Sequence, residues 1–315
     1  MKYSIGVDLG GTNIKAGLVD ENGKIIFKTS VPTETNLGYK HVINQIKKAT
    51  SIVLSENSNV TGIGIGAPGI VSVEEGTVKS PPNIPGWKKV NLAKILFDEF
   101  GRKVFVENDA NAAAIGESIF GVGKSINTFI MVTLGTGVGG GIIYNGKLFR
   151  GETGGAGEIG HLTINYKGRK CNCGSWGCIE TYVGNQKITE KVRREIKKYP
   201  DSKVHKLAGE NLSTLSPKTL YEAAKEGDDY ALKAISEVAV MLGAAFASAV
   251  NLLDISTIVL GGGVSGFGNY LLVPLKATLK ERVLAPNRPR VKVRLSKLKN
   301  DAGIKGASSL AFYHS

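Results

Sequence analysis

The fold is decided by residues 3–27, YSIGVDLGGTNIKAGLVDENGKIIF. Two β-rich runs at residues 3–7 and 14–19 flank a Gly-Gly turn, and an Asn-Gly turn precedes a third run at residues 24–27. Residues 129–149, FIMVTLGTGVGGGIIYNGKLF, repeat this order of strand, glycine turn, strand, Asn-Gly turn and strand. The repeat predicts two domains of related topology, residues 1–119 and residues 120–315. The last helix is expected to pack back on the N-terminal domain.

The length of 315 residues supports two domains of ordinary size. Forty Lys and Arg against 27 Asp and Glu give a net charge of +13, which favours a polyanion as partner unless the charge lies away from the chemistry. Residues 187–206 and 276–299 carry this whole excess. Neither block contains interleaved aromatic residues or a groove-reading module. We therefore expect solvated basic faces and no nucleic-acid partner.

The sequence predicts no membrane partner and a cytoplasmic location. Its longest weakly polar stretch, residues 238–250, has 13 residues, which is short of the roughly 20 needed to span a bilayer. Asp8 stands where the apolar region of a signal peptide would continue. The three cysteines lie within residues 171–178, which suits a reducing compartment and a metal site better than a disulfide framework.

The first glycine turn is a candidate phosphate loop. Glycines let successive backbone N–H groups point inward and form an anion-binding nest, and neighbouring polar side chains add donors. The acid at the end of the first strand can hold Mg²⁺ through water. The candidate residues are Asp8, Gly10, Gly11, Thr12, Asn13 and Lys15. An ordinary tight hairpin is the better interpretation of an isolated Gly-Gly turn, but the second loop favours phosphate binding.

The second loop, residues 135–141 with the sequence GTGVGGG, matches the dinucleotide fingerprint G-x-G-x-x-G by letter. That fingerprint requires a helix directly after the glycines, whereas residues 142–144 are typical of a strand. No P-loop sequence occurs either. A nucleotide phosphate would therefore be held by two hairpin loops.

Asn108 and Asp109 lie at a predicted junction between a strand at residues 104–107 and a helix at residues 110–119. Phosphoryl transfer to an alcohol needs one well-placed carboxylate to accept the hydroxyl proton, and Asp109 is the candidate. From the residues alone, a helix N-cap is an equally good interpretation of Asp109.

His161, Cys171, Cys173 and Cys178 form a soft ligand set that predicts a closed, structural Zn²⁺ site. His161 is the less secure ligand, because a single histidine ten residues upstream can simply be hydrogen-bonded. Glu158 and Glu180 flank this set, and carboxylates held near a rigid loop suit recognition of a polyhydroxylated ligand. Alternatively, one of them orients His161, and both roles are compatible.

Five elements together resemble the ROK family of sugar kinases, most closely its bacterial-type glucokinases. They are D-x-GGT from residue 8, ENDAN at 107–111, GTGVGGG at 135–141, GAGEIGH at 155–161 and CNCGSWGCIE at 171–180. These elements and the final glycine run extend from residue 5 to about residue 264, and the cysteine element is highly specific. The resemblance implies an α/β protein with the actin-like, ribonuclease H-like ATPase fold, in which two domains enclose a cleft.

By this resemblance, Asp109 is the catalytic base for transfer of the γ-phosphoryl group of ATP to the 6-hydroxyl of glucose. The implied sugar-binding residues are Asn108, Asp109, Glu158, His161 and Glu180, together with Gly69 and Asn83. The implied ATP-binding residues are those of the first loop, Thr136 and Gly137 of the second, and Gly261, Gly262 and Gly263. His161 would place one ring nitrogen on zinc and the other on a sugar hydroxyl. The implied assembly is a homodimer or homotetramer, and the small-molecule partners are the sugar and ATP with Mg²⁺.

Two alternatives remain open at this point. Mannose, fructose, allose or N-acetylmannosamine could replace glucose, and ADP or polyphosphate could replace ATP, because motifs do not report the fine placement of side chains. The family also contains sugar-responsive repressors with an added N-terminal DNA-binding domain, so a non-catalytic sugar sensor is the alternative of a different class. The intact phosphate loops and Asp109 argue against the sensor.

Overall fold

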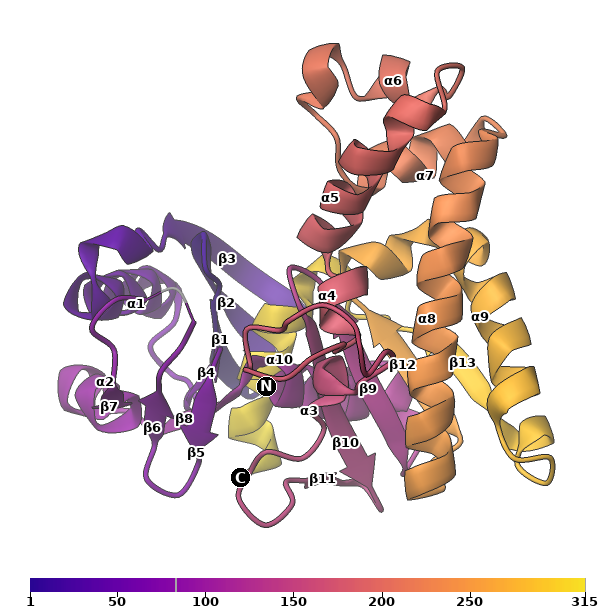
Figure 1. Cartoon of the computed structure of the whole chain (residues 1–315). Helices are drawn as coiled ribbons and strands as arrows, with labels where there is room; N and C mark the ends of the chain where they lie inside the picture. Colours follow the sequence, from indigo (N-terminus) through magenta and orange to yellow (C-terminus); the bar gives the residue numbers. More distant parts are fainter. Residues whose placement is uncertain (83, 315) are drawn as a thin grey trace. The chain divides into compact units, whose positions relative to one another are not determined.

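A computed structural model describes residues 1–82 and 84–314, which form two compact units (Figure 1). The first unit consists of Met1–Met131, Gly141–Gly157 and Ser296–Ser315, and the second of Val132–Gly140 and Glu158–Leu295. Asn83, one of the predicted sugar-binding residues, lies outside the described residues.

The first unit is built on a five-stranded sheet of order β3-β2-β1-β4-β8. Its strands are β1 (Tyr3–Leu9), β2 (Asn13–Asp20), β3 (Ile25–Pro32), β4 (Ile63–Ala67) and β8 (Val104–Asn108). The first three strands form the predicted antiparallel meander. Strands β4 and β8 then run parallel to β1, so the carboxyl ends of all three lie at one edge of the sheet.

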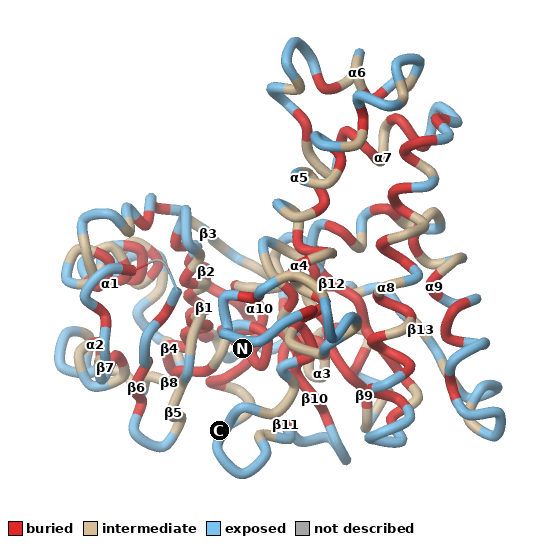
Figure 2. The backbone as a smooth tube through the Cα atoms, viewed as in Figure 1, coloured by how far each residue is buried: buried red, intermediate tan, exposed pale blue. Residues whose placement is uncertain are grey.

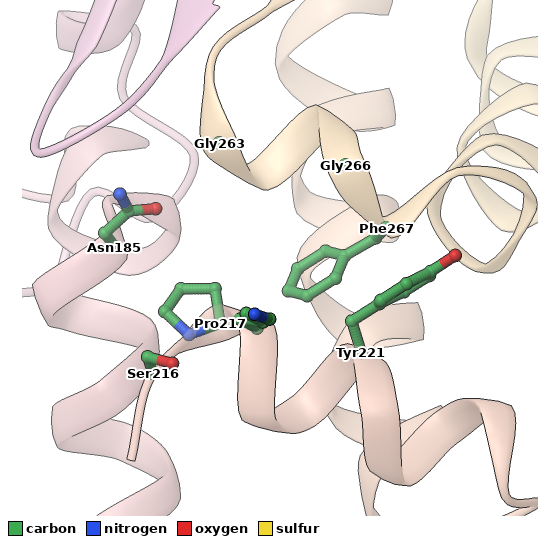
Figure 3. A pocket seen from close by; sticks show the side chains of 8 residues that line it. Asn185, Ser216, Pro217, Tyr221, Gly263, Gly266 and Phe267 are labelled. Carbon is green, nitrogen blue, oxygen red and sulfur yellow. The ribbon is translucent and has the colours of Figure 1, made fainter. Parts of the chain in front are cut away.

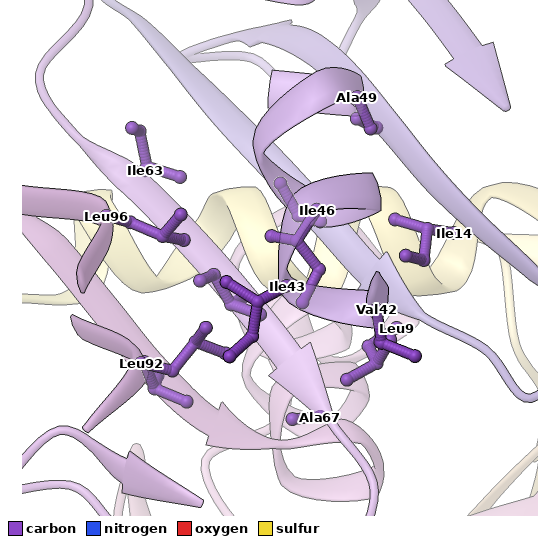
Figure 4. Packing of buried hydrophobic residues seen from close by; sticks show 14 of the residues in the cluster. Leu9, Ile14, Val42, Ile43, Ile46, Ala49, Ile63, Ala67, Leu92 and Leu96 are labelled. Carbon is purple, nitrogen blue, oxygen red and sulfur yellow. The ribbon is translucent and has the colours of Figure 1, made fainter. Parts of the chain in front are cut away.

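Helix α1 (Tyr39–Glu56) covers one face of this sheet, and its apolar side chains alternate at helical spacing. Figure 4 shows Val42, Ile43 and Ile46 of α1 among strand residues such as Ile14 and Ile63. All five side chains are at most 8% exposed. Burying this face supplies the apolar core of the first unit.

The C-terminal helix α10 (Ala302–Tyr313) packs on the sheet through glycines. A Cβ atom at Gly6 would lie 2.0 Å from the Ile304 carbonyl oxygen, and one at Gly64 would lie 1.8 Å from that of Ala307. These close approaches exclude any side chain at the two positions. They bring the helix backbone directly onto β1 and β4, and the Ser4 hydroxyl donates to the Ser308 carbonyl at 3.0 Å.

Two more helices and a small sheet complete the first unit, and the second of these helices follows the strand-to-helix junction predicted at residues 104–119. Helix α2 (Leu92–Phe100) is capped by Asn91 and ends at Gly101, and helix α3 (Asp109–Phe120) follows β8 directly. The small sheet is antiparallel and consists of β5 (Ile70–Ser72), β6 (Thr77–Lys79) and β7 (Lys89–Asn91). Its strands have three residues each, which is too short for a periodic pattern in the sequence.

A second five-stranded sheet has the order β11-β10-β9-β12-β13. Its strands are β9 (Phe129–Leu134), β10 (Val138–Tyr144), β11 (Lys147–Phe149), β12 (Thr257–Gly261) and β13 (Lys292–Leu295). The three consecutive strands β9, β10 and β11 thus form a meander. The later strands β12 and β13 lie on the other side of β9, just as β4 and β8 lie on the other side of β1 in the first sheet. This equivalence confirms the repeated topology predicted from the two glycine turns. Strand β13 was not predicted.

The second unit is mainly helical after residue 180 (Figure 1). Its helices are α4 (Glu180–Val183), α5 (Asn185–Glu195), α6 (Val204–Leu207), α7 (Pro217–Lys225), α8 (Asp229–Leu253) and α9 (Asn269–Arg282). The basic block at residues 187–206 begins on α5, where Ile188 and Val192 are buried and Arg193 and Arg194 are exposed. The Lys191 side chain is only 18% exposed and pairs with Glu195 and Glu237, so this basic face is not solvated throughout as expected.

Helix α8 is long and apolar enough to span a membrane by length and composition, with a mean hydropathy of 1.6. The sequence expectation considered only residues 238–250, whereas the helix begins nine residues earlier, at Asp229. About half of the apolar window, 56%, is buried inside the protein. Figure 2 shows buried and exposed residues in alternation along α8, the pattern of a core helix packed on one side.

Candidate functional site

One edge of the first sheet collects the polar residues that the sequence singled out in this unit. Asp8 of β1 pairs in register with Gly66 of β4, and the next residue, Ala67, pairs with Asn108 of β8. The carboxyl ends of parallel strands are where open α/β sheets bind ligands. The first glycine loop and the start of α3 therefore lie at the same edge of the sheet.

The first glycine loop is fastened to the end of β3. The Thr33 hydroxyl donates to the Gly10 carbonyl at 2.7 Å, and the Thr33 N–H donates to the Thr12 carbonyl at 2.9 Å. A Cβ at Gly10 would lie 2.6 Å from the Asn13 carbonyl, whereas one at Gly11 would meet nothing within 4 Å. The tight turn therefore requires glycine at position 10, whereas the space beside Gly11 is open and can accept a ligand. Thr12, Asn13 and Lys15 are exposed donors around it.

Asp8 is a partly buried carboxylate beneath this loop. Burial raises the pKa of its carboxyl group, and the charge of Lys15 acts in the opposite direction. A Cβ at Gly303 of α10 would lie 2.1 Å from the Oδ2 atom of Asp8. Only glycine at this position of α10 leaves enough space for the Asp8 side chain. A nearby cation stabilises the charged form of a buried carboxylate, so Asp8 is suited to a position near Mg²⁺.

The start of α3 separates the roles of Asn108 and Asp109. The Asn108 side chain accepts from the N–H groups of Ala110 and Asn111 at 3.0 and 3.3 Å, so Asn108 is the N-cap. The alternative interpretation of Asp109 as the N-cap is therefore wrong: Asp109 is the first helical residue, and its side chain is exposed. Its Oδ1 atom accepts from the Ala110 N–H at 2.8 Å.

Gly69 lies close to this junction, since the Asn108 side-chain amide donates to its carbonyl at 3.3 Å. Gly69 has φ +93°, and a Cβ there would lie 2.8 Å from the Lys79 carbonyl. The left-handed backbone and the close approach both require glycine. Gly69, Asn108 and Asp109 are thus neighbours in the first unit.

Residues 135–140 of the second glycine loop lie in the second unit, and strand β10 begins within the loop at Val138. A strand stands where the dinucleotide fingerprint requires a helix, so the exclusion of that fingerprint is confirmed. The Gly135 N–H donates to the Gly137 carbonyl at 3.0 Å. The Glu180 Oε2 atom accepts from the Val138 N–H at 2.9 Å, and a Cβ at Gly137 would lie 2.3 Å from that oxygen. Glu180 therefore supports this loop with one carboxylate oxygen. Thr136 is exposed at its tip.

The final glycine run reaches the second loop from β12. Gly262 has φ +84°, and a Cβ there would lie 2.3 Å from the Leu134 carbonyl at the end of β9. Gly261 ends β12, and Gly263 begins a short 3-10 turn. The three predicted glycines therefore lie at the end of a buried strand, and Gly262 approaches the residue that precedes the second loop.

A cavity of about 300 Å³ opens next to this glycine run (Figure 3). Pro217 of α7 and the aromatic rings of Tyr221 and Phe267 provide apolar surface, which suits a flat heterocycle. Asn185 also lines the cavity, and its N–H donates to the Gly135 carbonyl at 2.9 Å. The cavity and the second glycine loop are therefore directly adjacent. The lining residues are Asn185, Ser216, Pro217, Lys218, Tyr221, Gly263, Gly266 and Phe267.

The sequence reasoning identified only Gly263 of this lining. The other residues come from α5, α7 and the 3-10 turn after β12, and they include no chemically distinctive pattern. The one available signal was the capping box of α7, in which the Ser216 and Thr219 side chains bond each other's backbone N–H groups. That signal predicts a helix start and says nothing of a ligand.

A cysteine-histidine cluster forms in the second unit, where His161, Cys171, Cys173 and Cys178 each bring one ligand atom within 4.8 Å of the others. The His161 Nδ1 atom is 3.7 Å from the Cys171 Sγ, and the Cys173 and Cys178 sulfurs are 3.7 Å apart. Burial and the neighbouring thiols raise the pKa of the Cys178 thiol, so its thiolate needs a cation. Three sulfurs and one imidazole in this volume fit Zn²⁺.

Glu158 lies on the other side of the His161 ring. Its Oε2 atom is 3.8 Å from the His161 Nε2, beyond hydrogen-bond distance, and its side chain is 63% exposed. His161 therefore turns Nδ1 to the cysteines and Nε2 toward Glu158. This arrangement matches the two directions that the double role of His161 requires.

The structure thus gathers the predicted residues into two sets, one in each unit. The first unit holds the first glycine loop, Gly69, Asn108 and Asp109. The second unit holds the second glycine loop, the final glycine run, Glu158, Glu180 and the cysteine-histidine cluster. The adjacent apolar cavity is the addition that the sequence did not predict.

Comparison with known proteins identifies close relatives over nearly the whole chain. Residues 4–313 match the ROK family model. A glucokinase from Thermotoga maritima is 38% identical over 306 residues, which cover 97% of this chain and 96% of that protein. A ROK family glucokinase from Streptomyces griseus, solved in complex with glucose and AMPPNP, has a TM-score of 0.88 and 37% identity, covering 99% of both chains. A xylose repressor from Caldicellulosiruptor bescii is 32% identical and is matched over 77% of its length.

Proposed function

This chain belongs to the ROK family, and we propose that it is an ATP-dependent glucokinase that converts glucose to glucose 6-phosphate. The related glucokinases match it at up to 38% identity along almost their full length. The strand order of its two sheets agrees with the actin-like, ribonuclease H-like fold of sugar kinases. The observation that carries the proposal is the exposed Asp109 at the capped start of α3, on the sheet edge that also presents the Asp8 loop.

In the proposed reaction, Asp109 accepts the proton of the glucose 6-hydroxyl, and the hydroxyl oxygen attacks the γ-phosphorus of ATP. A new bond forms between that oxygen and phosphorus while the bond to the β-phosphate oxygen breaks, and ADP leaves. Positioning and a single base suffice for this chemistry. Mg²⁺, when bound, neutralises charge on the phosphate oxygens, and Asp8 is the residue that would hold it.

Glucose binding is assigned to polar residues, of which Glu158 is exposed and His161, Glu180 and Asn108 are half-buried. Glu158, His161 and Glu180 accept from or donate to ring hydroxyls, supported by Asn108 and, from the sequence, by Gly69 and Asn83. The cysteine-histidine cluster would hold Zn²⁺ and thereby fix the tautomer and the orientation of the His161 ring. Glu180 keeps one carboxylate oxygen for the sugar, since the other accepts from Val138.

ATP binding is assigned to the two glycine loops and the apolar cavity. The cavity between Tyr221, Phe267 and Pro217 suits the adenine ring, and Asn185 connects it to Gly135 of the second loop. Thr136, Gly137 and the run from Gly261 to Gly263 then lie along the path of the phosphates. The first loop supplies the donors Thr12, Asn13 and Lys15 to the terminal phosphates.

Replacement of Asp109 by Asn tests the assignment of the base. The variant should keep its glucose affinity, because the amide preserves the shape and much of the hydrogen bonding of the carboxyl group. Its kcat should fall by about 1,000-fold, the range that general-base catalysis contributes. A coupled assay of ADP formation measures kcat, and calorimetry measures the glucose affinity. Turnover near that of the unmodified enzyme would contradict the assignment.

A coupled assay that crosses a panel of hexoses with ATP, ADP and polyphosphate separates the alternatives. We expect the highest kcat/KM with glucose and ATP. A sugar-sensing protein, as the similarity to xylose repressors allows, would bind sugar without phosphorylating it with any donor. Preference for another hexose would keep the reaction and change only the acceptor.

We further propose a cytoplasmic homo-oligomer, a dimer or tetramer, with no nucleic-acid or membrane partner. Large apolar side chains on the second unit support association, since Leu252 is 79% exposed, Val273 65% and Leu284 58%. The three unpaired cysteines are compatible with a reducing compartment. Light scattering after gel filtration measures the mass of the particle and tests the assembly.

A further inference from the structure

Glu107 is a buried carboxylate that the proposed reaction does not use. It lies near the end of β8, two residues before Asp109, and it is 3% exposed. A buried carboxylate strongly destabilises a fold unless it is paired and hydrogen-bonded, so the partners of Glu107 decide its role. Its two carboxylate oxygens accept hydrogen bonds from two different segments of the first unit.

The Oε1 atom of Glu107 holds the junction between β8 and α3. It accepts from the Asn108 N–H at 3.0 Å and from the Asn111 side-chain amide at 3.2 Å. These two donors stand on either side of Asp109 in the chain. Asn111 is itself buried in the first turn of α3, at 4% exposed. One oxygen of Glu107 therefore fixes the backbone that carries Asp109.

The Oε2 atom of Glu107 holds a different segment of the first unit. The Arg150 guanidinium donates to it at 2.7 Å, and Arg150 follows directly after β11. The Arg150 carbonyl in turn accepts from the Ala156 N–H at 3.0 Å, which closes the loop at residues 150–156. That loop leads along the chain to Glu158.

These contacts also decide which carboxylate of the ENDAN element can act as the base. Both oxygens of Glu107 are occupied and its charge is balanced by Arg150, whose side chain is 30% exposed. Asp109 is exposed. A group that is buried and ion-paired can position a reacting group but cannot reach a substrate hydroxyl.

We propose that Glu107, paired with Arg150, is a positioning residue that sets the first turn of α3 and thereby the direction of the Asp109 carboxylate. This inference rests on the proposed function for the role of Asp109. Its physical basis is that a misplacement of about 1 Å at a reacting group costs about 100-fold in rate. The pair also joins the base-carrying junction to the start of the loop that precedes Glu158.

The test compares Glu107→Ala, Glu107→Gln and Arg150→Met with the unmodified protein. Glu107→Ala should lower kcat about 100-fold and leave KM for ATP unchanged, because no ATP-binding residue contacts Glu107 among the described residues. Glu107→Gln keeps an acceptor oxygen for Asn108 and Asn111 and should recover much of that loss. Arg150→Met leaves Glu107 in place, and its kcat should lie between that of Glu107→Ala and that of Glu107→Gln. Glu99→Ala, which removes an exposed, ion-paired carboxylate of the same unit, is the matched control and should leave kcat unchanged.

Amide hydrogen exchange at Ala110 and Asn111 supplies a readout that does not depend on turnover. Exchange there should be faster in Glu107→Ala than in the unmodified protein and nearly restored in Glu107→Gln. If the unmodified protein does not phosphorylate glucose, the proposed function fails, while exchange at these amides still tests the positioning. If it does, and folded Glu107→Ala keeps its kcat per active site, the positioning role is overturned. Equal loss in the Gln and Ala variants would also overturn it.

Discussion

The Asp8 carboxyl group is subject to two opposing influences, burial and the charge of Lys15, and burial is the larger. Its pKa is therefore raised above the ordinary value for Asp. A carboxyl group with a raised pKa in the folded protein favours folding while it is protonated, and this contribution is lost as the pH rises through the raised pKa. At neutral pH the ionised Asp8 carboxylate therefore lowers the free energy of unfolding of the ligand-free protein.

Replacement of Asp8 by Asn should consequently raise the unfolding temperature at neutral pH while lowering kcat. This increase in unfolding temperature should become smaller as the pH falls toward the ordinary pKa of Asp. At low pH the Asp8 carboxyl group is neutral in both the folded and the unfolded state. Thermal unfolding between about pH 4 and pH 8, without ATP or Mg²⁺, measures this dependence. Asp98→Asn, at an exposed residue of α2 that pairs with Lys94, is the control for the loss of one negative charge at the surface. A lower unfolding temperature for Asp8→Asn at neutral pH would contradict the argument.

Asn108 and Asp109 show what a sequence leaves undecided at single residues. Both residue types are favoured at helix N-caps, so composition cannot tell which of two neighbours takes the cap. The structure decides it through the backbone, since Asn108 has φ −59° and ψ 143° outside the helix and its side chain accepts from the first turn. The ion pair of Glu107 with Arg150 was equally invisible in the sequence, because the two residues are 43 positions apart.

At the scale of the element, the cysteine loop was predicted completely because its ligands are close together in the chain. His161 precedes Cys171 by ten positions, and Cys178 follows Cys171 by seven. The short spacing limits where the four ligand atoms can lie, and the soft donor set limits the metal.

Metal analysis of the purified protein should find about one Zn²⁺ per chain, as a closed four-ligand site implies. Removal of the metal, or Cys178→Ser, should weaken glucose binding, because the ring of His161 then loses its fixed orientation. Calorimetry with glucose measures this effect. Asn172→Ala, at an exposed residue between two cysteines, is the control and should keep both metal and affinity. Metal-free protein with undiminished glucose affinity would refute the zinc scaffold.

The packing of α10 on the first sheet gives a prediction about stability. Gly64→Ala should destabilise the fold by about 3 kcal/mol, the upper range for overpacking, because its Cβ would meet the Ala307 backbone at 1.8 Å. Gly66→Ala on the same strand is the matched control, since its Cβ would make only ordinary contacts at 3.6 Å or more. Denaturant unfolding measures both variants. Equal stability of the two would show that the close approach of α10 has no energetic consequence.

At the scale of the whole molecule, +8 of the net charge of +13 lies at residues 276–299, outside the proposed site residues. The other +5 lies at residues 187–206, which begin two residues after Asn185 of the cavity lining. The block at residues 276–299 occupies α9, β13 and their surroundings, which carry none of the proposed site residues. The side chains of Lys276, Lys280, Arg290 and Lys292 are exposed. Exposed charges of this kind act over about one Debye length, roughly 8 Å at physiological salt.

A variant with these four residues changed to Gln should therefore keep the kcat and KM of the unmodified enzyme. Its retention on a heparin column should fall, because that retention reports unspecific attraction between charges. The coupled assay and the salt concentration of elution are the measurements. A loss of turnover in this variant would place a functional partner or substrate contact on the basic block.

The sequence by itself determined the repeated meander, the two glycine loops, the cysteine-histidine cluster, the candidate base and the family. Each of these depends on residues that are near one another in the chain, where spacing and residue type limit the geometry. The sequence led us to expect the last helix on the N-terminal domain, but only the tertiary structure decided its close contacts with β1 and β4. Only the tertiary structure also decided the apolar cavity beside Asn185 and the Glu107–Arg150 pair. These features join segments that are tens to hundreds of residues apart. The chain between such segments imposes almost no constraint on their meeting, so contact and burial in the folded state decide it.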